Sequence, residues 1–134
     1  MSYLSHSESQ EMYLKVIYLL KKHNPNVRAV DIREELGYSK SSVSSALKLL
    51  KEHGYIEIDN NIISFTSKGS IVAKHVYNKY LLFAEMFENL GICEKEAGEI
   101  ACKMEHIVPD SIFFKIRKAL QKHRRNEHGD ELKY

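Results

Sequence analysis

The chain has 134 residues, 43% of them hydrophobic and 28% charged, and its formal net charge at pH 7 is +2. This composition is typical of a soluble globular protein and argues against disorder, collagen-like repeats and low-complexity linkers. No apolar run approaches the roughly 18 residues of a membrane span, and the first residues lack the basic region and apolar core of a secretory signal. Two cysteines, Cys93 and Cys102, argue against a disulfide scaffold, so we expect a cytoplasmic protein.

The charge is unevenly distributed along the chain. Between Lys21 and His53 there are seven basic and four acidic residues, and between Lys115 and Arg125 there are six basic residues and none acidic. A positive face of this kind could follow a phosphate backbone. Two solvated helix faces would give the same pattern, so charge alone favours neither interpretation.

The first predicted helix runs to Lys22. Ser7 followed by Gln10 resembles a capping box, which predicts Ser7 as the N-cap. Apolar residues then recur at helical spacing, at Met12, Val16, Leu19 and Leu20. Residues 24–26, Asn-Pro-Asn, end the helix.

Two shorter helices follow, joined by a turn that contains glycine. The pattern of residues 30–36 predicts the first of these helices, and Gly37 ends it. Ser39 caps the second, and Gly54 follows its carboxyl end. The second helix has a narrow apolar stripe at Val43, Ala46, Leu47 and Leu50. Two helices joined in this way predict a helix-turn-helix, whose second member we call the recognition helix.

The periodicity then changes to that of strands. Residues 55–58 and 62–65 are rich in β-branched and aromatic side chains, and residues 59–61, Asp-Asn-Asn, tolerate positive φ. These features predict a hairpin. A hairpin directly after a helix-turn-helix makes a winged helix.

Three helices complete the predicted chain. Thr66 caps a long helix to about Leu90, and two further helices cover residues 94–107 and 109–122. The polar tail, residues 126–134, is expected to fray. The predicted fold is therefore mainly α, with a winged helix-turn-helix domain at residues 1–70 and an all-helical dimerisation domain at residues 71–134.

Small hydroxyls and lysines occupy the exposed side of the recognition helix, whose amino-terminal residues lie nearest the bases in such motifs. The candidate DNA-binding residues are Ser39, Lys40, Ser41, Ser42, Ser44, Ser45 and Lys48. Hydroxyls donate to phosphates and bond to base edges directly or through water, but this set has no Arg or Asn for bidentate readout. Serines that merely cap and solvate a helix are the alternative, against which the turn and the hairpin favour DNA binding.

A second group of chemically capable residues lies in the fifth predicted helix. Cys102, Glu105 and His106 stand at positions i, i+3 and i+4, so they project from one face. Sulfur, carboxylate and imidazole converging there would bind a divalent transition metal. Three residues alone are a weak signal, and the alternative is a buried Cys, a solvated Glu and a partly buried His.

Three segments resemble the diphtheria-toxin-repressor and manganese-transport-regulator family. They are Gln-Glu-Met-Tyr-Leu at 10–14, Thr-Ser-Lys-Gly at 66–69 after the wing, and Ala-Cys-Lys-Met-Glu-His at 101–106. The resemblance implies a dimeric, metal-activated repressor that binds a palindromic operator. In the iron-responsive branch a Met of the first helix joins the Cys, Glu and His, which implies Met12 as the fourth ligand beside Cys102, Glu105 and His106.

The chain also departs from this family. Tyr80 and Ala84, with Glu85 next to it, stand where a second metal site usually has His and Glu, so we expect that site to be absent or rebuilt. The resemblance implies the short form that lacks an SH3-like domain. In the manganese branch, carboxylates stand at the positions that Met12 and Cys102 occupy here. A further acidic ligand of that branch stands at the position of Lys15. Because a thioether and a thiolate are soft, we favour Fe(II) over Mn(II).

The sequence therefore predicts a metal-dependent repressor that forms a homodimer on double-stranded DNA. The apolar residues expected in a two-fold dimer core, if they do not pack within one chain, are Ile112, Phe113, Phe114 and Ile116. One alternative is a redox-sensing winged helix with Cys102 or Cys93 as its thiol switch and His106 lowering the thiol pKa. A small metal- or Cys-dependent enzyme and a protein-interaction module are the others.

Overall fold

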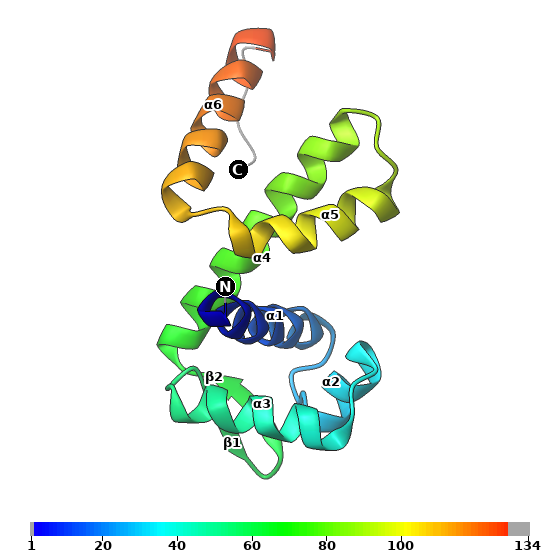
Figure 1. Cartoon of the computed structure of the whole chain (residues 1–134), viewed down its shortest axis with the longest axis vertical. Helices are drawn as coiled ribbons and strands as arrows, with labels where there is room; N and C mark the ends of the chain where they lie inside the picture. The colour runs from blue at the N-terminus through cyan, green and yellow to red at the C-terminus, as the bar shows by residue number, and fades with distance from the viewer. Residues whose placement is uncertain (1, 129–134) are drawn as a thin grey trace. The chain divides into compact units, whose positions relative to one another are not determined.

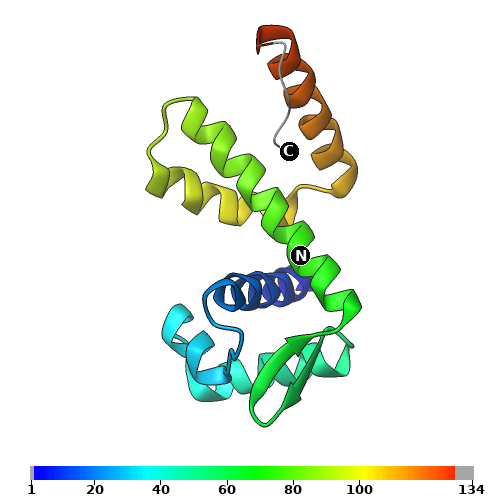
Figure 2. The same ribbon diagram turned by 180° about the vertical axis from the view of Figure 1, so that it is seen from behind.

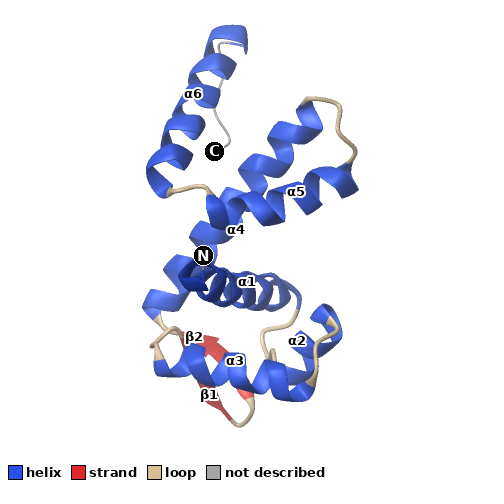
Figure 3. Cartoon of the chain, in the orientation of Figure 1, coloured by secondary structure: helices blue, strands red, loops and turns tan. Residues whose placement is uncertain are grey.

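The computed structural model describes residues 2–128, with side chains from 8 to 123 (Figures 1 and 3). In chain order the elements are α1 (Ser2–His23), α2 (Ala29–Leu36), α3 (Lys40–Glu52), β1 (Ile56–Asp59), β2 (Ile62–Phe65), α4 (Ser67–Asn89), α5 (Glu94–Ile107) and α6 (Asp110–His128). The mainly helical fold with a winged helix-turn-helix is confirmed. No helix in the described part of the chain is long and apolar enough to cross a membrane.

The chain divides into two compact units, Met1–Tyr77 and Asn78–Tyr134. We call them the N-terminal unit and the C-terminal unit. The division falls inside α4, which is one continuous helix. The predicted domains, residues 1–70 and 71–134, have their boundary earlier in the same helix, and they remain a prediction about how the chain folds.

The N-terminal unit is built around one core. α3 buries its stripe of Val43, Leu47 and Leu50, and the antiparallel β1–β2 hairpin lies beside α3 (Figure 2). Ile58 pairs with Ile63 in the hairpin. The core residues are Tyr13, Leu14, Ile17, Val27, Ile32, Val43, Leu47, Leu50, Ile56, Ile63 and Ala73. This core fixes α1 and the hairpin against the recognition helix.

The local signals at the element ends are mostly confirmed. Asn60 and Asn61 have φ of 51° and 67°, as the predicted turn requires. Ser39 caps α3 by accepting a hydrogen bond from the backbone N–H of Ser42, at 3.1 Å. Thr66 Oγ1 accepts one from the Gly69 N–H at 3.1 Å, which caps α4.

Two predicted helix ends were wrong. α1 begins at Ser2, so Ser7 lies inside the helix and is not its N-cap. α6 continues to His128, past the predicted end at Lys122 and into the tail that we expected to fray. Residues 129–134 lie outside the described residues. A capping box and a polar tail are local signals. Both helices extend beyond them because each residue added to an existing helix gains a hydrogen bond.

The C-terminal unit has a smaller core, in which Phe83 and Phe113 meet edge to face with ring centroids 6.2 Å apart. The buried ammonium of Lys79 donates to the Val108 carbonyl at 2.7 Å and lies 3.1 Å from Asp110 Oδ1. Lys79 therefore fastens α4 to the corner between α5 and α6. Phe113 packs within the chain, whereas Ile112 and Phe114 are 45% and 44% exposed.

Candidate metal centre and nucleic-acid interface

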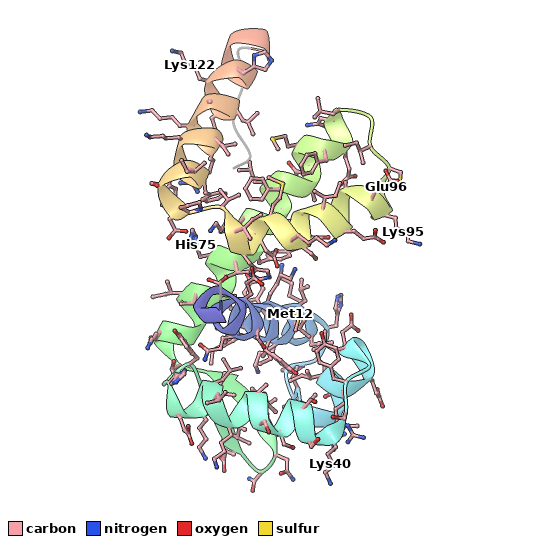
Figure 4. All side chains as sticks on the ribbon, in the orientation of Figure 1. Met12, Lys40, His75, Lys95, Glu96 and Lys122 are labelled. Carbon is pink, nitrogen blue, oxygen red and sulfur yellow. The ribbon has the colours of Figure 1, made fainter. Side chains whose placement is uncertain are left out.

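The predicted DNA-contacting surface is fully presented to solvent. Ser39, Lys40, Ser41, Ser42, Ser44, Ser45 and Lys48 are all exposed. Lys40, at the amino end of α3, extends away from the protein in Figure 4. The surface is therefore accessible to a large partner, because Val43, Leu47 and Leu50 on the opposite side of α3 are buried.

Three of the serines are bonded to one another. Ser39 Oγ donates to Ser42 Oγ at 2.9 Å and lies 3.3 Å from Ser41 Oγ. A base or phosphate that bonds to these hydroxyls must compete with these internal bonds, so the net gain per contact is reduced. Ser44, Ser45 and the two lysines lie outside this network of three serines, further along the exposed face or at its edge.

Sequence reasoning missed a basic pocket next to this surface. Its volume is about 490 Å³, and it lies between the start of α2, the side of α3 and the wing. Ala29, Val30, Leu47, Ile58 and Ile63 contribute apolar walls, and the polar lining residues are Arg28, Ser44, Lys48, Lys51 and Asn61. Three cations around one hollow attract phosphate oxygens.

The excess of basic residues before His53 was the signal for this pocket. The sequence alone did not show that Arg28 and Lys51, which are 23 positions apart, border the same hollow as Lys48. That arrangement depends on the packing of α2 against α3, which brings the start of α2 next to the side of the recognition helix.

In the C-terminal unit, Glu105 and His106 form a close pair. The Glu105 side chain is fully buried and the His106 side chain is 9% exposed, with Glu105 Oε1 3.0 Å from His106 Nε2. A buried carboxylate is costly unless a cation or a hydrogen-bond donor compensates its charge. Carboxylate and imidazole are both common ligands of divalent transition metals, so the donor chemistry of this pair fits such an ion.

Cys102 is exposed, although it stands one turn before Glu105. It lines an open hollow with Tyr80, Cys93, Gly98 and Glu99, among others. In the described part of the chain, no three side chains of His, Cys, Asp or Glu come close enough together to hold a metal ion. The structure therefore brings Glu105 and His106 into contact and leaves Cys102 exposed on the same helix. The packing alternative was wrong on two points, because it expected a buried Cys and a solvated Glu.

α1 contributes the fourth predicted ligand. Met12 is partly buried against the core of the N-terminal unit (Figure 4). Lys15, one turn later on α1, is 5% exposed. Its ammonium has no lone pair for a metal, so this position adds positive charge where an acidic residue would add a ligand.

The two positions usually used for a second metal site are occupied differently here. Ala84 is 6% exposed within the core of the C-terminal unit and has no side-chain donor atom. The Tyr80 hydroxyl approaches Gly98 so closely that a Cβ added at Gly98 would lie 3.2 Å from it. That the second site is absent or rebuilt from other groups stays a prediction, and these contacts support it.

The two cysteines are too far apart for an intrachain disulfide. Cys93 is the N-cap of α5 and Cys102 lies nine positions later in the same helix. At 1.5 Å per residue the two Cα atoms are separated by roughly 13 Å, whereas a disulfide needs less than about 7 Å. A thiol switch in this chain would therefore use one cysteine alone or join two chains.

Two models of one protein family match this chain over most of its length. The sequence matches the family described as iron dependent repressor, with the N-terminal DNA binding domain at residues 5–61 and the metal binding and dimerisation domain at residues 66–132. An uncharacterised HTH-type transcriptional regulator of Methanocaldococcus jannaschii, MJ0568, is 34% identical over 87% of this chain and 95% of its own length.

The iron-dependent repressor IdeR of Mycobacterium leprae is 26% identical over 84% of this chain and 50% of its own length. Among solved structures, the manganese regulator SloR superimposes with a TM-score of 0.72 and 29% identity over 83% of this chain and 53% of its own. A manganese-dependent transcriptional repressor in complex with manganese gives 0.75 and 26% identity over 93% and 58%. The chain spans about half the length of these three proteins.

Proposed function

This chain belongs to the iron-dependent repressor family, and on that premise we propose that it is a metal-activated, DNA-binding transcriptional repressor that controls metal homeostasis. Members of the family are metal-dependent transcriptional repressors and not enzymes, which removes the enzyme alternative. The observation that carries the proposal is the buried Glu105–His106 pair, in a chain whose other unit presents a recognition helix.

The proposed metal ligands are Met12, Cys102, Glu105 and His106. A thioether and a thiolate suit Fe(II) better than Mn(II), so Fe(II) is the proposed activator and Mn(II) the alternative. The thiol of Cys102 is exposed and stands one turn before Glu105 on α5. When bound, the cation supplies positive charge that stabilises the thiolate and the buried carboxylate.

The chain's own packing connects these ligands to DNA. Met12 lies on α1, and α1 shares one core with α3 through Tyr13, Leu14 and Ile17. The orientation of the recognition helix therefore follows the position of α1. A ligand set that is complete in only one arrangement of the chain favours that arrangement by its differential affinity.

We further propose a homodimer on a palindromic operator in the cytoplasm. The C-terminal unit exposes large apolar side chains at Leu90, Ile100, Ile107, Ile112 and Phe114, and burial between two copies would remove them from water. A two-fold dimer presents two recognition helices, which read half-sites about 34 Å apart or a multiple of it.

The experiment is fluorescence anisotropy of reduced, metal-free protein on palindromic and generic DNA, titrated anaerobically with Fe(II) and separately with Mn(II). We expect DNA affinity to rise at least about tenfold with Fe(II), the size of a typical coupling. Met12→Ala and His106→Ala should abolish the rise. Met86→Ala and His123→Ala are matched controls away from the proposed ligands, and they should retain it.

Each other result contradicts a defined part of the proposal. Equal or stronger activation by Mn(II) would show that the softness argument is wrong. A measurable DNA affinity that neither metal changes would refute metal activation. The thiol-switch alternative would then be tested with Cys102→Ser under oxidising and reducing conditions.

A further inference from the structure

The turn that follows the recognition helix is held by two other helices. This turn, His53 to Tyr55, connects α3 to the wing. From α1, Gln10 Nε2 donates a hydrogen bond to His53 Nδ1 at 2.9 Å. From the start of α4, Lys68 Nζ donates to the His53 carbonyl at 3.0 Å, and Thr66 Oγ1 donates to the Gly54 carbonyl at 2.6 Å. The carboxyl end of α3 is therefore the point where α1 and α4 both attach.

The attachment to α4 is extensive and close. The Tyr55 carbonyl accepts a hydrogen bond from the Thr66 N–H at 3.1 Å. It also lies 3.1 Å from Thr66 Oγ1, whose single proton is shared between the carbonyls of Gly54 and Tyr55. A Cβ added at Gly69 would overlap that same carbonyl, so the backbone of α4 lies directly against the turn. Lys68 also lies over the Tyr55 ring, with Nζ 4.5 Å from the ring centroid. These contacts join the end of α3 to the start of α4 through both backbone and side chains.

The attachment to α1 is of a different kind. α1 and α3 share the apolar core, whose close packing holds the two helices together over a broad area. The Gln10–His53 hydrogen bond is directional, because its strength depends on distance and angle. It joins two residues 43 positions apart, and it lies at the exposed edge of the interface between α1 and α3.

We propose that Gln10 is a positioning residue for DNA binding. Its hydrogen bond to His53 transmits the position of α1 to the recognition helix. Gln10 stands two residues before Met12 on the same helix. A displacement of α1 at Met12 therefore also displaces Gln10. The inference rests on the proposed function, because it needs a DNA affinity that responds to metal.

The test measures the ratio of DNA affinity with metal to DNA affinity without it, by anisotropy on the full chain. Gln10→Ala and His53→Ala should each lower this ratio by about two- to tenfold, the value of one hydrogen bond. The double variant should lose no more than either single variant, because both changes remove the same bond. Gln10→Glu should restore most of the ratio, since its carboxylate accepts a bond from the His53 ring. Ser9→Ala, an exposed neighbour on α1, should leave the ratio unchanged.

Linkage provides a readout that a merely structural role would not move. Metal affinity of the DNA-free protein should be the same in wild type and Gln10→Ala, whereas metal affinity of the DNA-bound protein should fall by the same factor as the ratio. Equal loss of DNA affinity with and without metal would overturn the proposal. So would an unchanged ratio in Gln10→Ala.

The two proposals fail in different ways. A wild-type protein whose DNA affinity does not respond to metal would refute the proposed function, and this inference would fall with it. A wild-type protein that responds, together with a Gln10→Ala variant that responds equally, would refute the transmission by Gln10 alone.

Discussion

The two units of the chain differ in how many apolar side chains they bury and how many they leave exposed to solvent. Among the described side chains, the N-terminal unit buries eleven residues in one core, and its large exposed apolar side chains are Tyr38, Leu49 and Ile71. The C-terminal unit buries five residues in its core and exposes five large apolar side chains. Both units bury a lysine, Lys15 in the N-terminal unit and Lys79 in the C-terminal unit, and the C-terminal unit also buries the carboxylate of Glu105.

This difference separates two tasks. The N-terminal unit has the larger apolar core, and its proposed functional face is the exposed polar surface of α3. The C-terminal unit leaves apolar surface in water and carboxylate in the interior, which are the groups that a second copy and a cation would satisfy. Substitutions at matched positions in the two units test this interpretation.

The largest expected effect is on the free energy of unfolding, and it comes from comparing alanine substitutions at two helical glycines. At Gly69, in the N-terminal unit, a Cβ would overlap the backbone carbonyl of Tyr55, which also accepts a hydrogen bond from the Thr66 N–H. Gly69→Ala should therefore lower the free energy of unfolding by about 2–4 kcal/mol. Urea denaturation of the full chain measures this loss.

Gly98, in the C-terminal unit, provides the comparison. A Cβ there would meet only the Tyr80 hydroxyl at 3.2 Å, and the end of a side chain can shift. Because alanine is favoured over glycine in a helix by about 1 kcal/mol, Gly98→Ala should be neutral or slightly stabilising. If both variants lost the same stability, the tight backbone approach at Gly69 would not be a distinguishing feature of the N-terminal unit.

The second effect concerns the exposed apolar side chains. Ile112→Asp should raise the dimer dissociation constant by about tenfold or more, because a charge would have to be buried in the proposed interface. Ile71→Asp is the matched control, since Ile71 is 70% exposed in the other unit. Sedimentation equilibrium measures both constants. If only Ile71→Asp raised the dimer dissociation constant, the interface would lie in the N-terminal unit and the proposal would be wrong.

The smallest effect is a pH dependence of the N-terminal core. Burial raises the pKa of Tyr13 above its ordinary value of 10.0, and the nearby Tyr38 raises it further. The folded state therefore favours the neutral phenol. This stabilisation is fully present below pH 10.0 and is lost as the pH rises through the higher pKa of the folded protein.

Tyr13→Phe should reduce the decline in stability above pH 10, as followed by urea denaturation at several pH values. Tyr18→Phe, which changes a partly buried tyrosine on the same helix, is the control. A decline that persists unchanged in Tyr13→Phe would show that another group causes it.

Most of the fold could be predicted because its signals are local. The stripe of α3, the Asn60–Asn61 turn and the caps at Ser39 and Thr66 each depend on residues within one or two turns of chain. The start of α1 could not be predicted in this way. The pattern at Ser7 is compatible both with an N-cap and with a position inside a helix, and in the structure Ser7 lies inside α1.

The candidate site was less predictable than the fold. Spacing places Cys102, Glu105 and His106 within one arc of a helix, but rotamers and the tilt of α5 decide which side chains are buried. The structure buries Glu105 beside His106 and leaves Cys102 exposed. The pocket of Arg28, Lys48 and Lys51 depends on packing between helices, which no local pattern encodes.

The bonded serines of the recognition helix have a consequence for kinetics. Ser39, Ser41 and Ser42 already bond to one another, so each base contact they make adds little to the lifetime of a complex. Lysine contacts with phosphates, which do not depend on sequence, allow a protein to slide along DNA and shorten its search. We therefore expect short residence times on any single DNA site, with lysine–phosphate contacts contributing most of the affinity.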